Sequence, residues 1–376
     1  MSEDGVAARR LAIEVLERVE TDGAYANLLL PKLLEESTLD IRDRGFVTEL
    51  TYGSTRMLRA LDFAADRFID RDDVDSRVRA AVRVGAYQLL FMRVPAHAAV
   101  DATVGATPKR GRGFVNAVLR KVSKGGDPEW PTVGHRLSYP KWIVDRLTDD
   151  LGDRAVGVLK AMNEAATTHT RPDGYRQDSA SQAVAALVDP DGLVLDLCAA
   201  PGGKATFIAG NADDGHVVAS DLHPHRAGLV LTAAKDTGTT LSSVVADATN
   251  PPYRNGCADA VLIDAPCSGL GSLRRRPDAR WRIKPADVDN LAELQFGLVE
   301  SASTLVKPGG QVVFSVCTLT NAESTAVDDR IAAELPQLEA QPLNDLWEPH
   351  GRGGRLLPDM FDGDGMAAFV YRMRET

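Results

Sequence analysis

The first third of the chain carries apolar side chains at helical spacing. Between Val6 and Ser123 they recur every third or fourth position, as at Leu11 and Val15, and no strand-like alternation interrupts them. Short polar or proline-containing breaks, such as Asp22-Gly23, separate the segments. The pattern predicts an all-helical bundle, with helices that include residues 26–34, 44–69, 78–92 and 114–122.

The pattern changes twice further along the chain. From Lys124 to Asp191 it weakens, and prolines and a polar run indicate a linker with helices over 142–162 and 179–188. Beyond it, short apolar runs each end in an acidic or small polar residue, at 193–197, 216–221, 243–247, 260–264 and 311–315. Helical stretches over 205–210, 226–236 and 287–305 alternate with these runs. This alternation predicts buried parallel strands in a doubly wound, Rossmann-like α/β sheet.

Three parts follow from these changes. We expect an all-helical domain over residues 1–125, a linker with helix over 126–178, and a Rossmann-like α/β domain over 179–376. A chain of 376 residues is long enough for two or three hydrophobic cores.

Composition limits the classes of partner. A net charge of -10 argues against a generally basic nucleic-acid-binding surface, so any RNA contact must come from local patches. The four cysteines show no CxxC spacing, so we expect reduced thiols and no metal site. The sequence begins without the apolar core of a signal peptide, and no stretch is long enough to cross a membrane. We therefore expect a cytoplasmic protein with no membrane partner.

A loop of small residues follows the first predicted strand and leads into a helix. It consists of Cys198, Ala199, Ala200, Pro201, Gly202, Gly203 and Lys204. Glycines let the backbone approach a ligand closely, and a helix N-terminus offers free N–H groups. The loop is typical of nucleotide-type ligands. It is not the G-x-G-x-x-G fingerprint of dinucleotide enzymes, because Pro201 and Lys204 occupy that space.

Three aspartates end successive predicted strands, namely Asp221, Asp247 and Asp264. Ligands of open α/β sheets bind at this edge, where Asp221 has the spacing for a ribose hydroxyl and Asp247 could address an adenine. Each aspartate alone is more simply a cap or turn residue. Three in register favour a ligand.

Two cysteines emerge at the same predicted edge. Cys267 follows the strand that ends at Asp264, and Cys317 follows the next strand. This pair suits methylation of cytosine at carbon 5, because that carbon becomes nucleophilic only after a thiolate adds at carbon 6. A second group must then help to remove the carbon-5 proton and release the enzyme. Two buried, inert cysteines are the simpler alternative, which their places at adjacent strand ends make less favoured.

Charged neighbours fit this chemistry. A free thiol has a pKa of about 8.5, so its thiolate needs a nearby cation, for which Lys204 is the candidate. Asp264 could bind the N3/N4 edge of the base. A cytosine inside a duplex is out of reach, so the target must be single-stranded or flipped out.

A basic stretch with a tryptophan follows Cys267. Its candidate RNA contacts are Arg274, Arg275, Arg276, Arg280, Trp281 and Arg282, which suit phosphates and a stacked base. A solvated basic loop is the simpler alternative, but the position beside a thiol favours RNA. Lys109-Arg-Gly-Arg112 is a weaker candidate of the same kind.

With these residues assembled, the C-terminal half resembles the RsmB/Sun family of ribosomal RNA cytosine-5 methyltransferases. The matching segments are 197–204, 220–221, 246–247, 264–268, 275–281 and 315–317. The resemblance implies that Cys317 attacks carbon 6, that Cys267 assists release, and that S-adenosylmethionine is held by residues 198–204 with Asp221, Asp247 and Asp264.

The helical half resembles the NusB-type RNA-binding domain of bacterial RsmB, through residues 23–29, 97–100 and 113–119. This pairing implies small-subunit (16S) ribosomal RNA as the substrate. We expect that RNA, or a small-subunit assembly intermediate, to be the partner, and the protein to be a monomer. Two features depart from the family. Val316 replaces the usual Thr before the nucleophile, and only Glu323 remains of the acidic pair that follows it. The chain is also short between Asp150 and Gln177, where many relatives carry an additional RNA-binding subdomain.

Three other functions compete with this interpretation. A DNA cytosine methyltransferase typically uses the Pro-Cys thiol alone, so Cys317 argues against it. A ribosome-assembly or antitermination factor without catalysis would not need the intact loop at 198–204 and both thiols. Methylation of cytosine in another RNA remains the nearest alternative.

Overall fold

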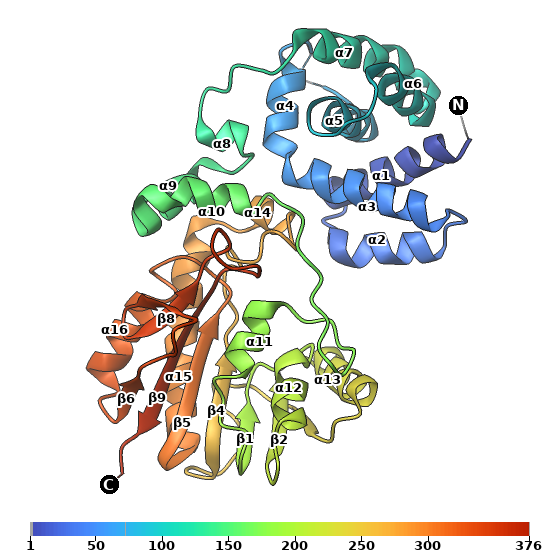
Figure 1. The fold of residues 1–376 in the computed structure, drawn as a ribbon. Helices are drawn as coiled ribbons and strands as arrows, with labels where there is room; N and C mark the ends of the chain where they lie inside the picture. The colour runs from blue at the N-terminus through green and yellow to red at the C-terminus, as the bar shows by residue number, and fades with distance from the viewer. Residues whose placement is uncertain (1–2, 72, 376) are drawn as a thin grey trace. The chain divides into compact units, whose positions relative to one another are not determined.

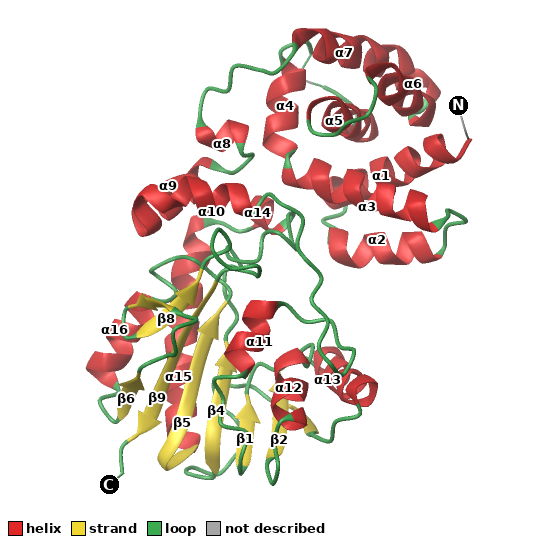
Figure 2. Cartoon of the chain, viewed as in Figure 1, coloured by secondary structure: helices red, strands yellow, loops and turns green. Residues whose placement is uncertain are grey.

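The chain forms two compact units in a computed structural model that describes residues 3–71 and 73–375. The first unit comprises residues 1–145 with 276–282, and the second comprises 146–275 with 283–376. An all-helical part followed by a doubly wound α/β sheet was predicted, and this fold class is confirmed (Figures 1 and 2).

The first unit is a bundle of helices. They are α1 (Glu3–Thr21), α2 (Ala26–Glu35), α3 (Ile41–Arg56), α4 (Leu58–Asp66), α5 (Ser76–Leu90), α6 (Ala96–Ala106), the short 3-10 helix η1 (Lys109–Gly111), α7 (Arg112–Gly125) and α8 (Val133–Arg136). One face of each long helix is apolar, and Leu50, Leu61, Val82 and Leu119 are fully buried where these faces meet. A separate part of the chain completes this unit, because the short helix α14 (Ala279–Arg282) belongs to it.

The single helix expected over 44–69 is two helices, α3 and α4, with a break at Met57. The Ser138 hydroxyl accepts hydrogen bonds from the backbone N–H groups of Arg59 and Ala60, at 3.0 and 3.4 Å. These are donors of the first turn of α4, which the helix itself leaves unsatisfied. A residue far along the chain therefore fixes the start of α4.

Helices also fill the segment expected to be a linker. The long helix predicted over 142–162 is α9 (Lys141–Leu151), the 3-10 helix η2 (Gly152–Arg154) and α10 (Ala155–Ala161). Gly152 has a φ of +57°, a left-handed conformation that ends α9. α11 (Ser179–Ala185) then leads into the sheet, and the Asp178 side chain caps its first turn.

The second unit is built on a nine-stranded sheet. Its strands are β1 (Leu193–Asp196), β2 (His216–Asp221), β3 (Ser242–Val245), β4 (Ala258–Asp264), β5 (Val306–Val316), β6 (Leu338–Gln341), β7 (Glu348–His350), β8 (Gly353–Leu356) and β9 (Met366–Met373). The order is β3-β2-β1-β4-β5-β9-β8-β7, with β6 also paired to β9. The five predicted strands are parallel neighbours, whereas the antiparallel strands β6 to β9 were not predicted.

Alternate residues of the central strands divide the core into two layers. Val194, Leu262 and Val313 face a cluster that contains α11, α12 (Gly203–Gly210) and α13 (Pro224–Thr237). Leu195, Ile263 and Val312 face the other cluster, under α15 (Pro285–Leu305) and α16 (Thr325–Glu334) (Figure 1). Helices therefore cover both faces, and the carboxyl ends of the parallel strands are left to carry the site. None of the described helices combines the length and apolar character needed to cross a membrane.

Candidate active site

The two predicted thiols meet at the carboxyl edge of the sheet. β4 and β5 are parallel neighbours, with Asp264 paired to Ser315, so the residues that follow each strand emerge side by side. Cys267 and Cys317 are three and two residues beyond this pair, and their Sγ atoms are 3.2 Å apart. Both cysteines are free and partly buried. The sequence predicted that both cysteines lie at the same edge of the sheet, and in the structure their sulfur atoms are in contact.

The surroundings favour a negative charge on Cys317 rather than on Cys267. A hydrogen bond from Cys267 lowers the pKa of the Cys317 thiol, against the effects of burial and of Asp264, and Lys204 acts in the same lowering direction. The reverse holds for Cys267, whose pKa is raised by its hydrogen bond to Cys317, by burial and by the Glu323 charge. Because the shared hydrogen bond is the largest influence on both thiols and favours the charge on Cys317, while Glu323 opposes a charge on Cys267, Cys317 is the better thiolate.

Lys204 and Asp264 form an ion pair beside the thiols. Lys204 Nζ donates to Asp264 Oδ2 at 2.7 Å, and the Ser315 hydroxyl donates to Asp264 Oδ1 at 2.9 Å. Burial opposes the charge of Lys204, but Asp264 and Cys317 outweigh it and raise the pKa of the ammonium group. Lys204 is therefore a fixed cation at the site, and both oxygens of Asp264 are engaged.

Glu323 connects the two loops that carry the thiols. Its fully buried carboxylate accepts hydrogen bonds from the Ser268 backbone at 2.7 Å and hydroxyl at 2.6 Å, and from the Thr318 hydroxyl at 3.0 Å. Ser268 follows Cys267 and Thr318 follows Cys317 in the sequence. Thr320 and Gln295 donate to the same carboxylate at 2.9 and 3.2 Å. The sequence marked Glu323 only as the remnant of an acidic pair, and gave no sign of this role.

A backbone crossing holds the Cys267 loop against the end of β5. The Gly271 N–H donates to the Cys317 carbonyl at 3.0 Å, and the Gly365 N–H donates to the Gly271 carbonyl at 2.9 Å. A Cβ at Gly271 would lie 2.1 Å from the Gly365 carbonyl oxygen, so only glycine fits between these two chains.

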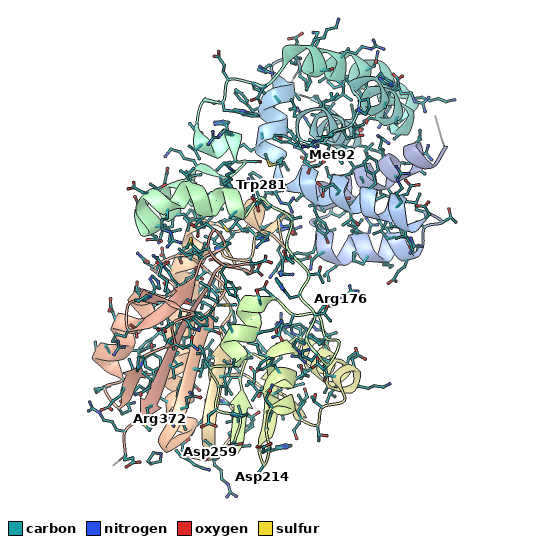
Figure 3. The ribbon with its side chains drawn as sticks, in the orientation of Figure 1. Met92, Arg176, Asp214, Asp259, Trp281 and Arg372 are labelled. Atoms are coloured by element: carbon teal, nitrogen blue, oxygen red, sulfur yellow. The ribbon has the colours of Figure 1, made fainter. Side chains whose placement is uncertain are left out.

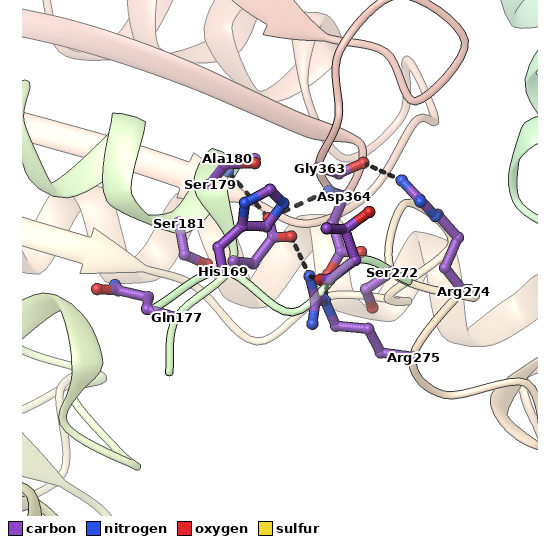
Figure 4. Close-up of polar contacts among 12 residues, drawn as sticks. His169, Gln177, Ser179, Ala180, Ser181, Ser272, Arg274, Arg275, Gly363 and Asp364 are labelled. Carbon is purple, nitrogen blue, oxygen red and sulfur yellow. Dashed lines mark hydrogen bonds and ion pairs between the residues drawn. The ribbon is translucent and has the colours of Figure 1, made fainter. Parts of the chain in front are cut away.

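Arg275, further along the same loop, makes polar contacts with other segments of the chain (Figure 4). Its guanidinium donates to Asp178, to Asp364 at 3.2 Å and to the Thr167 carbonyl at 3.1 Å. Burial, more than the neighbouring Asp178, raises the pKa of Asp364 to about 7, against the opposite pull of Arg275. Arg274 donates to the Gly363 carbonyl at 3.2 Å. These two arginines, predicted to contact RNA, are engaged by protein groups.

Most other residues of the predicted RNA-binding stretch also contact protein groups. Arg280 is fully buried in the helical unit, 4.0 Å from the Tyr139 ring, and donates to the Ser138 carbonyl. The Trp281 indole, labelled in Figure 3, donates to the Thr55 carbonyl at 2.7 Å. Arg282 donates to the Gly23 carbonyl at 2.8 Å, and Arg276 alone of the set is exposed. Arg280, Trp281 and Arg282 thus donate to backbone carbonyls more than 140 residues away, which the sequence could not show.

Asp196 lies close to Asp264 and Lys204, although it was not among the predicted residues. It ends β1, is 1% exposed, and its Oδ2 has no hydrogen-bond partner among the described residues. Burial, then the neighbouring Asp264, raises the pKa of Asp196 to about 7. The signal was present, since Asp196 is the acidic residue of the first predicted strand.

The predicted cofactor loop has the conformation its glycines allow. Gly202 has a φ of +110°, and a Cβ there would lie 3.0 Å from the Val230 Cα, which explains glycine at this position. α12 begins immediately afterwards, so its first N–H groups face the loop. Burial and nearby carboxylates raise the pKa of Cys198 far above its usual range, so its thiol stays neutral.

Asp221 and Asp247, the other two predicted cofactor-binding aspartates, differ in their surroundings. Asp221 is buried and accepts from Arg226 at 3.0 Å and from the His223 N–H at 3.1 Å. Asp247 is exposed and accepts from the Thr249 backbone and hydroxyl, which lower its pKa and form the turn that was the simpler alternative. Among the described residues no group of histidine, cysteine and acidic side chains could hold a metal ion.

Comparison with known proteins covers both units. The profile of the family described as 16S rRNA methyltransferase RsmB/F matches residues 184–370, and that of the NusB family matches residues 6–124. A protein of Bacillus subtilis named "Probable ribosomal RNA small subunit methyltransferase B" is 31% identical, over 98% of this chain and 99% of its own length. The ribosomal RNA small subunit methyltransferase B of Salmonella newport is 30% identical, over 95% of this chain and 96% of its own.

Two further comparisons concern length and fold. A Mycobacterium tuberculosis protein, named provisionally as a methyltransferase, is 37% identical over 97% of this chain and 96% of its own. That alignment runs over 446 positions, more than the 376 residues here, so the relative carries residues that this chain lacks. The solved structure of the protein PH0851 has the same fold, with a TM-score of 0.80 and 20% identity over 100% of this chain and 99% of its own.

Proposed function

Because the chain belongs to the RsmB/F family of RNA methyltransferases, we propose that it methylates carbon 5 of a cytosine in 16S ribosomal RNA. In this proposal S-adenosylmethionine is the methyl donor, Cys317 is the covalent nucleophile and Cys267 assists release. The observation that supports it best is the 3.2 Å contact between the two sulfur atoms, beside a buried cation.

The first step is addition of Cys317 to the base. The Cys317 thiolate, held by the Cys267 hydrogen bond and the Lys204 charge, forms a bond from sulfur to carbon 6 of the cytosine. The electron pair of the 5,6 double bond moves to carbon 5, which becomes nucleophilic. When bound, S-adenosylmethionine supplies the methyl group that carbon 5 takes.

Cys267 changes its role when the adduct forms. In the free enzyme, the hydrogen bond to Cys317 is the main reason why the pKa of Cys267 is raised. Once Cys317 is a neutral thioether, it no longer accepts this hydrogen bond and no longer carries a negative charge. Cys267 therefore ionises more readily and releases its proton to solvent. The Cys267 thiolate then removes the carbon-5 proton, the double bond reforms, and Cys317 leaves as a thiolate. Two adjacent thiols thus exchange a single negative charge during the cycle.

The cofactor would lie over the loop 198–204 and the strand ends beside it. Asp196 offers a buried carboxylate oxygen without a partner, which suits a cationic group such as the ammonium of a bound amino acid. The first N–H groups of α12, which begins directly after Gly202, are donors available to polar ligand atoms. Asp221, Asp247 and Asp264 complete the set that we propose for S-adenosylmethionine.

The remaining features of the proposal concern the whole chain. We propose that residues 1–125 form an RNA-binding domain, that 126–178 connect it to the catalytic domain over 179–376, and that the protein acts as a monomer. The NusB match over residues 6–124 supports the first of these assignments.

Bisulfite sequencing of ribosomal RNA tests the substrate. RNA from cells with and without the gene should differ at a cytosine of the small-subunit RNA, and complementation with Cys317→Ala should leave that cytosine unmodified. Cys257→Ala, a change of the same kind at a partly buried cysteine away from the proposed mechanism, serves as the control. An unchanged 16S pattern, with a difference in another RNA, would redirect the proposal to that RNA.

A further inference from the structure

The helical unit carries a run of cations that the proposed chemistry does not use. From residue 102 to residue 126 the sequence contains no Asp or Glu, in a chain of net charge -10. Six exposed basic residues lie within this run, and together they are called here the α7 basic surface: Lys109, Arg110, Arg112, Arg120, Lys121 and Lys124. Three of the six, Lys109, Arg110 and Arg112, lie in the segment 109–112 that the sequence indicated as a weaker RNA-binding candidate.

The fold forces these residues outward. Val115, Val118, Leu119 and Val122 are buried against the helical core, so the opposite side of α7 faces solvent. From Arg112 to Lys124 an α-helix rises by about 18 Å, or more than three turns. The exposed residues between the cations, Gly113, Ala117 and Ser123, are small, and Phe114 is half-buried with the Arg71 guanidinium 4.1 Å from its ring.

Most of these charges lack a carboxylate partner. Among the described residues, the ion pair of Arg110 with Asp75, at 2.7 Å, is the only one formed by the α7 basic surface. Arg112 donates to backbone carbonyls and Arg120 to the Asn116 side chain. Some cations elsewhere in this unit do have carboxylate partners, as Arg83 has Glu20 and Asp62. Uncompensated like charges repel one another, and a bound polyanion removes that cost.

We infer that the α7 basic surface binds the phosphate backbone of the substrate RNA. Phosphate contacts need cations in a row and no base-specific groups, which is the composition of this surface. An anionic membrane fits less well, because membrane-surface helices add exposed Phe, Leu or Trp and none lies between residues 102 and 126. The inference rests on the proposed action on RNA, and it assigns the phosphate contacts to the α7 basic surface rather than to residues 274–282.

The test compares two triple variants of the full chain. Lys109→Gln, Lys121→Gln and Lys124→Gln remove three charges from the α7 basic surface. The control, Lys32→Gln, Lys160→Gln and Lys235→Gln, removes three charges from exposed lysines at the ends of other helices. Binding of a cytosine-free single-stranded RNA oligonucleotide is measured from 50 to 250 mM salt. This probe reports binding alone, so the result does not depend on whether Cys317 methylates.

Each lost phosphate contact reduces the slope of log affinity against log salt by about 0.7, so the first variant should lose about 2 in slope. At 0.1 M salt its affinity should fall roughly 100-fold, and the control variant should bind far more tightly than this one. Equal affinity and slope in the two variants would overturn the inference. So would loss of binding to vesicles containing anionic lipid with RNA binding retained. If RNA binding behaves as expected while no RNA is methylated, the inference stands and the proposed function fails.

Discussion

Glu323 touches neither thiol in the reaction proposed here, yet its carboxylate receives hydrogen bonds from both thiol-bearing loops. Removing it takes away one acceptor shared by five buried donors. The Gln295 amide keeps the Pro266 carbonyl, at 2.9 Å, and the hydroxyls of Ser268 and Thr318 keep each other. The hydrogen bonds to the carboxylate that are lost cost about 3 kcal/mol or more together. Glu323→Ala should therefore lower the free energy of unfolding by about that amount and reduce methylation more than tenfold.

Glu323→Gln is the matched variant for this prediction. It keeps the shape of the side chain and one carbonyl oxygen, and the hydroxyls of Thr318 and Thr320 are free to reorient toward its amide. It should retain most of the stability and a measurable rate. Urea unfolding and initial methylation rates check both variants, and wild-type behaviour of Glu323→Ala would show that the thiol loops are held by other contacts.

Asp196 predicts a dependence of stability on pH. Burial raises its pKa to about 7 in the folded protein, well above that of an exposed carboxyl group. The folded state therefore binds this proton more tightly, so the stability it contributes is present below about pH 4 and is lost as pH rises through 7. His350, whose pKa is lowered to about 4 mainly by burial, has the opposite effect, so only a comparison between variants isolates Asp196.

Asp196→Asn mimics the protonated carboxyl at every pH. Relative to wild type it should gain roughly 1–3 kcal/mol in the free energy of unfolding between pH 5 and pH 8. Denaturant unfolding at both pH values measures this, with the exposed Asp289→Asn as control. A difference between Asp196→Asn and wild type that does not change with pH would mean that Asp196 is ionised throughout.

At the scale of elements, the loops at the strand ends depend on close backbone packing. Gly271 lies between the Gly365 and Cys317 backbones, so Gly271→Ala must push them apart. We expect a loss of about 1–3 kcal/mol in stability, typical of overpacking, and a large loss of methylation because the Cys267 loop moves. Gly297→Ala, in α15 with no atom within 4 Å of the added Cβ, should leave both unchanged or slightly improve stability. Equal activity of the two variants would contradict the packing account.

The elements that could be predicted are those with a local signal. Short apolar runs predicted β1 to β5, because a buried parallel strand is recognisable from its own run of apolar residues. The antiparallel strands did not stand out: β7 and β8 are short, and β9 (Met366–Met373) is as compatible with a buried helix as with a strand. The division between α3 and α4 was also missed, since a hydroxyl 79 residues away from Arg59 creates it.

In the candidate site, too, the features with a local sequence signal could be predicted and those that depend on distant contacts could not. The edge at which Cys267 and Cys317 emerge follows from strand order, so it could be predicted. The roles of Glu323 and Arg275 could not, because they arise from contacts between segments 55 and 97 residues apart. A basic stretch in a sequence also looks the same whether its arginines bind RNA or protein carbonyls.

At the scale of the whole molecule, the chain combines a helical unit and an α/β unit, and residues 276–282 belong to the helical unit although the residues on both sides of them belong to the α/β unit. The side chains of Arg280, Trp281 and Arg282 act as structural links to that unit's backbone. The division of labour proposed here is therefore RNA binding on α7 and chemistry at the ends of β4 and β5.

The central claim is that Cys317 forms a covalent bond with the target base and Cys267 ends it. The most direct test incubates Cys267→Ala with 16S ribosomal RNA and S-adenosylmethionine, and separates the products on a denaturing gel. The account predicts a slowly migrating protein–RNA adduct that is absent from wild type and from the Cys267→Ala, Cys317→Ala double variant. An adduct that persists in the double variant, or none at all with turnover unchanged, would contradict it.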